Sequence, residues 1–178
     1  MRKLPQWICL AQTGMIMAGL SCVAAHAESD VTPLAASGDL FHMIDARPIS
    51  ELWLNPGFLS YHWQRDQDLN GDNYGLGAEY RFSTVASITV GEYYNSNRAD
   101  SKYLGLYYQP FGIGDVRFGA AAGGFNGYPN YKNGGWFLAA IPVASYDYKC
   151  VGLSVSFVPS YQNRLYGSLS FQFNLKVF

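Results

Sequence analysis

The chain is poor in charged residues: Asp, Glu, Lys and Arg make up 14% of its 178 residues, against about 25% in an ordinary soluble domain. The charges nearly cancel, leaving a formal net charge of −1. An excess of cations that would neutralise phosphates is therefore missing, and we expect no nucleic-acid partner. The sequence also contains no P-loop and no dinucleotide fingerprint, which sets phosphoryl transfer aside.

Cysteine and histidine are scarce as well. Cys9 and Cys22 lie in an N-terminal leader, so Cys150 is the one thiol beyond it. A single thiol forms no internal disulfide, and stability must come from the fold itself. His42 and His62, the histidines beyond the leader, lack metal-ligand spacing, so we expect neither a metal nor another cofactor.

Long apolar runs are absent beyond the N-terminus. Residues 1–27 contain the three parts of a secretory signal peptide, namely Arg2 and Lys3, the mostly apolar stretch Trp7 to Val23, and the cleavage site Ala25-His26-Ala27. Polar residues interrupt the apolar stretch, which falls short of the roughly 20 residues of a transmembrane helix. A lipoprotein anchor at Cys22 is the alternative, with a poor lead-in sequence before it.

Residues 28–51 form a mixed lead-in to the rest of the chain. Apolar residues such as Leu40 and Met43 alternate irregularly with Asp39 and Asp45, and Pro48 follows. The spacing predicts a short amphipathic helix at the membrane interface. A flexible segment is the alternative.

Alternation of apolar and polar residues dominates the chain from Leu52 to the C-terminus. A period of two places one face of a strand in an apolar medium and the other in a polar one. Eight segments show it: 52–65, 74–83, 85–95, 101–109, 115–125, 135–147, 150–159 and 165–177. Aromatic residues at the strand ends favour a membrane barrel over a soluble sandwich. We therefore predict an all-β fold, an eight-stranded antiparallel up-and-down transmembrane β-barrel over residues 52–178.

The lengths of the connections predict the orientation of this barrel. Longer polar loops follow alternate strands, at Asp66–Asn73, Ser96–Asp100, Asn126–Gly134 and Ser160–Arg164. Shorter connections lie between them, at Ser83-Thr84, Pro110–Gly114 and Asp147–Lys149. Outer-membrane barrels keep short turns in the periplasm and longer loops outside. We expect a monomer in the outer membrane, with periplasmic termini and membrane lipids as partners.

Two prolines, Pro142 and Pro159, fall inside predicted strands. Proline donates no hydrogen bond to a ladder, so each predicts a gap or a bulge, and a gap offers lipid a lateral entrance. Small residues at Ala120–Ala122 fit an interior that holds a hydrocarbon chain. Relief of crowding in a narrow barrel explains them equally well.

Four short motifs follow one another along the chain in this order: Asn55-Pro56 to Tyr61-His62, Tyr94-Asn95-Ser96, Ile141-Pro142-Val143-Ala144-Ser145, and Phe157-Val158-Pro159-Ser160-Tyr161-Gln162-Asn163. Over most of residues 52–178 this order resembles the lipid A palmitoyltransferases of the outer membrane, the PagP type. The resemblance implies an eight-stranded barrel after an amphipathic helix, an interior hydrocarbon pocket, and catalytic groups at the outer rim. Each motif is short, and their shared order carries the resemblance.

The resemblance also implies a catalytic site. The histidine and the Asp-Ser pair that the family requires fall on His62, Asn95 and Ser96, so an amide stands where the family has a carboxylate. An amide cannot act as a base or hold an imidazolium by charge, and Asp66 and Asp100 in adjacent loops are the candidates to replace it. His62 would be the general base and Ser96 the nucleophile or an oxyanion partner. A plain interfacial histidine is the alternative.

Three functions are compatible with this sequence. The resemblance implies transfer of an acyl chain from a phospholipid to lipid A, and the large side chains of Leu106, Tyr107 and Tyr108 predict a short chain. A non-enzymatic structural or surface-contact barrel is the alternative, with residues 126–131 as contact surface, because fold does not determine function. A deacylase acting on lipid A or phospholipid with the same groups is the third.

Overall fold

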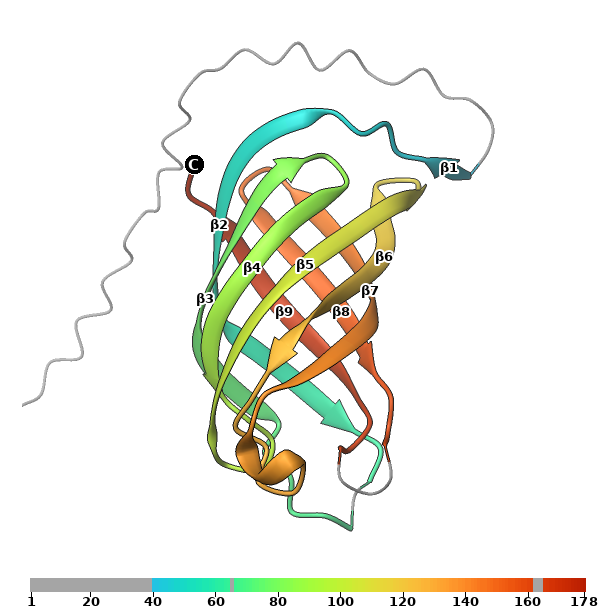
Figure 1. The fold of residues 1–178 in the computed structure, drawn as a ribbon. Helices are drawn as coiled ribbons and strands as arrows, with labels where there is room; N and C mark the ends of the chain where they lie inside the picture. Colours follow the sequence, from blue (N-terminus) through green and yellow to red (C-terminus); the bar gives the residue numbers. More distant parts are fainter. Residues whose placement is uncertain (1–39, 65, 162–164) are drawn as a thin grey trace, which may run out of the picture.

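The computed structural model describes residues 40–64, 66–161 and 165–178, which form a closed β-barrel (Figure 1). Its strands are β2 (Pro48–His62), β3 (Asp72–Ser83), β4 (Ala86–Tyr94), β5 (Asp100–Ile113), β6 (Val116–Phe125), β7 (Phe137–Tyr148), β8 (Val151–Val158) and β9 (Ser168–Lys176). Consecutive strands pair antiparallel, and β9 pairs with β2 to close the barrel. The predicted eight-stranded antiparallel up-and-down barrel is confirmed.

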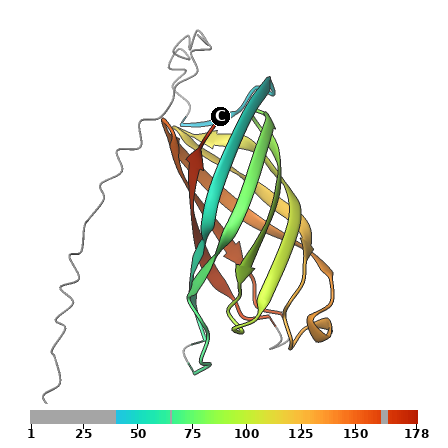
Figure 2. The same ribbon diagram turned by 90° about the vertical axis from the view of Figure 1, so that its left-hand side faces the viewer.

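The two ends of the barrel differ. Tight turns join β3 to β4, β5 to β6 and β7 to β8 at one end, the turn end, where β1 and the C-terminus also lie (Figures 1 and 2). The longer connections gather at the other end, the loop end, and include η1 (Lys132–Gly134), a single 3-10 turn. Over the described parts of the chain, no helix has the length and apolarity needed to cross a membrane.

The barrel is apolar outside and largely polar inside. Leu76 and Leu138 point outward and are 65% and 87% exposed. Asn55, Arg81 and Gln109 point inward and are buried. This distribution is the reverse of a soluble protein and follows from the period-two alternation, because successive side chains of a strand face opposite sides of the wall.

A charged network fills the interior near the turn end. Arg81 is 3% exposed and lies 2.9 Å from Glu79 and 2.6 Å from Asp147. Its guanidinium also stacks on Trp53, 4.1 Å from the ring centroid. Arg117 completes the network with a second contact of 2.6 Å to Asp147. These charges are paired because unpaired charges would be costly to bury. The paired groups fill this half of the lumen.

The segment before the barrel differs from the prediction. Residues 40–50 are extended, with β1 (Phe41–Met43) and the start of β2, where a short amphipathic helix was predicted; residues 28–39 and the leader lie outside the described residues. The β4 ladder on β5 stops at Tyr108, and β1 pairs with the β5 edge beyond it. An open strand edge favours added pairing, and this explains the extended form.

Strand β5 is longer than predicted, because Pro110 lies inside it rather than in a turn. The register with β6 shifts between Tyr108 and Phe111, so Pro110 sits in an irregularity, where a missing N–H is tolerated. The chain reverses only between Ile113 and Val116.

The ladder between β7 and β8 is incomplete. It runs from Tyr148 opposite Val151 to Val143 opposite Ser156 and stops there, although β7 extends to Phe137. Pro142 is the first β7 residue beyond the ladder, and it still pairs with β6. The predicted interruption at Pro142 is confirmed. Pro159, in contrast, follows the end of β8.

Candidate functional site

The structure brings together two of the three predicted site residues. His62 is the last residue of β2, and Ser96 lies in the turn after β4. Nε2 of the His62 ring and Oγ of Ser96 are 2.8 Å apart, within hydrogen-bond distance of a base and the hydroxyl that it activates. Ser96 is buried, with 8% of its surface exposed, whereas His62 is half-buried.

Backbone contacts between loops hold this pair at the loop end. The N–H of Asn70, in the loop between β2 and β3, donates to the carbonyl of Ser96 at 3.0 Å. On the other side, His62 is paired across the sheet with Ser168 of β9. The two candidates thus lie at the ends of strands that β3 separates in the sheet, and the folded loops bring them into contact.

Among the residues that the structure describes, no carboxylate forms a hydrogen bond with the His62 ring. Its Nδ1 atom is buried without a hydrogen-bond partner among the described residues. Asp66 and Asp100, the candidates to replace the missing carboxylate, are both exposed, and the Asp66 side chain accepts a hydrogen bond from Gln67 instead. His62 and Ser96 therefore form a dyad, without the carboxylate that would complete a triad.

Asn95, the third predicted site residue, is fully buried and directs its amide away from the dyad. Its Oδ1 accepts from the N–H groups of Asn97 (2.8 Å) and Ala99 (3.1 Å), and its Nδ2 donates to Ser101 Oγ (2.8 Å) and Gly127 O (2.7 Å). None of these partners belongs to the dyad, so the geometry gives the Asn95 side chain a structural connection to two loops.

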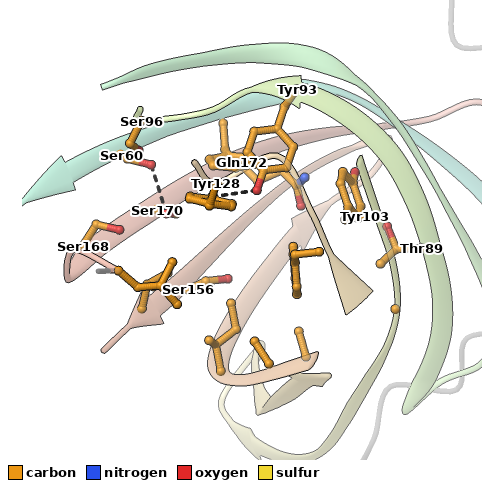
Figure 3. A pocket seen from close by; sticks show the side chains of 18 of the residues that line it. Ser60, Thr89, Tyr93, Ser96, Tyr103, Tyr128, Ser156, Ser168, Ser170 and Gln172 are labelled. Carbon is orange, nitrogen blue, oxygen red and sulfur yellow. Dashed lines mark hydrogen bonds between the residues drawn. The ribbon is translucent and has the colours of Figure 1, made fainter. Parts of the chain in front are cut away.

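A cavity of about 160 Å³ lies inside the barrel beside the dyad. Figure 3 shows side chains of several strands converging on it. His62 and Ser96 line it, as do the apolar side chains of Phe58, Phe137, Ala139, Ile141, Val158 and Leu165. Hydroxyl groups line part of the wall, where Ser60 and Ser170 lie 3.2 Å apart. A mostly apolar cavity with polar groups at its reactive end suits an amphipathic ligand.

The three large residues of the fourth predicted strand do not act together on this cavity. Tyr107 lines it, and its hydroxyl donates to Gln172 at 3.4 Å. Tyr108 points out of the barrel and is 60% exposed. Leu106 is half-exposed on the same outer face and reaches only the margin of the cavity. Of the three, Tyr107 is the residue that limits the depth of the cavity.

The loop between β6 and β7 covers part of the cavity, a contribution that the sequence does not signal. Tyr128 of this loop lines the cavity, and its hydroxyl lies 2.7 Å from that of Tyr93 in β4 (Figure 3). Its ring also packs edge-on against Phe137. Burial raises the pKa of the Tyr128 hydroxyl, so it remains protonated and able to donate.

Among the residues that the structure describes, no cluster of His, Cys, Asp or Glu could hold a metal ion. No family model matches the chain, and no curated protein matches its sequence. The function is therefore inferred from the geometry of the site and from the properties of the barrel wall.

Proposed function

We propose that this chain is a PagP-type acyltransferase of the outer membrane, which moves an acyl chain from a phospholipid to lipid A. The observation that carries the proposal is the 2.8 Å contact between His62 Nε2 and Ser96 Oγ at the end of an apolar cavity. The predicted signal peptide, residues 1–27, would direct the chain to the periplasm before it inserts.

The dyad supports a two-step transfer. In the first step the Ser96 hydroxyl gives its proton to His62 Nε2 and attacks the ester carbonyl of the phospholipid. The ester bond breaks, and the lysophospholipid oxygen leaves with that proton. In the second step a lipid A hydroxyl gives its proton to His62 and attacks the acyl group on Ser96, which restores the serine.

The cavity supports binding of a hydrocarbon chain. Its apolar wall would hold the chain while the ester group remains beside the dyad. Ile141 and Val158 line the cavity on the two sides of the interrupted β7–β8 ladder. A chain could pass from the lipid phase into the cavity at this interruption without crossing the polar network at the turn end.

The outer surface supports residence in a membrane. Large apolar side chains are exposed on every barrel strand except β6, among them Leu54, Leu76, Val90, Leu104, Leu138 and Phe173. A soluble protein rarely exposes apolar surface on this scale, whereas closure pairs the backbone groups that lipid cannot satisfy.

Mass spectrometry of lipid A tests the proposal. Cells that express the wild-type chain should contain lipid A with one additional acyl chain, and cells that express Ser96→Ala should not. Loss of a chain from lipid A would indicate the deacylase instead. Unchanged lipid A, with the barrel correctly inserted, would contradict both enzymatic functions and favour the surface-contact barrel.

A further inference from the structure

The amide of Asn95 makes one hydrogen bond that only a donor can supply. The carbonyl of Gly127 accepts and never donates, yet it lies 2.7 Å from Asn95 Nδ2. A carboxylate of the same shape keeps the two bonds that Oδ1 accepts, but it sets a negative oxygen against this carbonyl. Because Asn95 is 0% exposed, solvent would not relieve the repulsion.

The bond to Gly127 holds residues 126–134, which we name the lid. Gly127 has a φ of +82°, and a Cβ there would overlap the carbonyl oxygen of Asp100, so the lid backbone is in close contact with β5. Tyr128, the next residue, lines the cavity and contacts the Tyr93 hydroxyl. The position of Tyr128 over the cavity therefore depends on the anchor at Gly127.

Asn95 also holds the turn that carries Ser96, the proposed nucleophile. Ser96 directly follows Asn95, and the Asn95 side chain closes the turn that carries Ser96 by accepting from Asn97 and Ala99. One buried amide thus connects the turn of the nucleophile with the lid.

We infer that Asn95 is a positioning residue whose amide couples closure of the lid to the alignment of Ser96. The inference rests on the proposed function and deepens it. A closed lid excludes water from the acyl group on Ser96, which favours transfer to a lipid hydroxyl over hydrolysis.

Asn95→Asp, in the purified full-length chain in phospholipid vesicles, tests the coupling. Proteinase K cleavage within the lid, mapped by mass, reports lid opening without any need for activity. At about pH 8 the new carboxylate repels Gly127, and cleavage should be about 10-fold faster than in wild type. At about pH 5 protonation of the carboxyl restores a donor to Gly127. Burial and the facing carbonyl raise the pKa of this carboxyl, and the Asn97 and Ala99 N–H groups oppose that rise. Cleavage should then return to the wild-type rate at that pH, which a misfolded variant would not do.

Asn126→Asp is the matched control within the lid. Asn126 accepts from the Lys102 N–H at 2.7 Å through Oδ1, a bond that a carboxylate retains. Its cleavage should equal that of wild type at both pH values. Equal cleavage of Asn95→Asp and wild type at about pH 8, or an equal increase in the control, overturns the inference.

The product ratio is the second readout. For Asn95→Asp, the share of hydrolysis should rise at high pH and return to the wild-type share at low pH. An unchanged share despite an open lid overturns the coupling to Ser96. If the wild type yields neither product, the proposed function fails, and proteolysis still decides whether Asn95 holds the lid.

Discussion

His62 Nε2 and Ser96 Oγ lie 2.8 Å apart, although 34 residues separate them along the chain. The contact joins the end of β2 to the turn after β4, two elements that are not neighbours in the sheet order. Asn70 strengthens this bridge by binding the carbonyl of Ser96. The dyad is therefore a property of the closed barrel and its loops rather than of any local motif.

Removal of either dyad group should abolish acyl transfer while the barrel stays folded. For His62→Ala we expect kcat/KM to fall about 10²–10⁴-fold, the usual contribution of a general base. Ser96→Ala should have no measurable transfer. Lipid A acylation measures activity, and heat-modifiable migration on gels measures folding.

Ser50→Ala controls for the loss of a hydroxyl. Ser50 lies near the turn end, where its hydroxyl is 3.1 Å from that of Tyr80, and its loss should leave acylation unchanged. Wild-type acylation by Ser96→Ala would show that this hydroxyl is not the nucleophile.

The depth of the cavity should determine the length of the transferred chain. Tyr107→Ala removes a ring from the cavity and should shift the transferred acyl chain to a greater length, because the chain can extend into the space released. Tyr108→Ala, at the adjacent outward-facing position, removes an equal volume and should leave chain length unchanged. Mass spectrometry of lipid A measures both, and identical chain lengths in the two variants would contradict the assignment of Tyr107.

The charged network at the turn end should be needed for stability. Arg81→Met leaves Glu79 buried without its cation, whereas Asp147 keeps its contact with Arg117. We expect a loss of about 3–5 kcal/mol in the free energy of unfolding. Arg98→Met is the control, because the Arg98–Asp68 pair is exposed and contributes about 0–1 kcal/mol. Urea unfolding in phospholipid vesicles measures both values. Equal stabilities of the two variants would show that the network contributes little.

The loop end should face the cell exterior. Cysteine-directed labelling of intact cells, with Lys132→Cys in the lid and Asp115→Cys in the β5–β6 turn, each in a Cys150→Ser background, measures the orientation. We expect an impermeant reagent to label the first and not the second, because β1 and the C-terminus lie at the turn end and an exported chain would insert from the periplasm. The opposite pattern would reverse the topology.

Strand number and class could be predicted from the sequence because alternation is a local consequence of a two-sided wall. Each residue of β3 from Tyr74 to Phe82 faces either the outer surface or the lumen of the barrel, and that environment selects its side chain. The extended form of residues 40–50 could not be predicted in this way. It depends on a free edge of β5 at Phe111–Ile113, which exists only after β4 and β5 have paired.

The sequence by itself determined the candidate residues, since a histidine and a serine at strand ends are visible in the order of motifs. Only the tertiary structure decided that His62 contacts Ser96, that Asp66 and Asp100 do not, and that Asn95 binds Gly127. Periodicity reflects the environment on each side of a single strand. Hydrogen bonds depend on groups that the tertiary fold brings within about 3 Å, and nothing near Asn95 in the sequence indicates that Gly127 will be its partner.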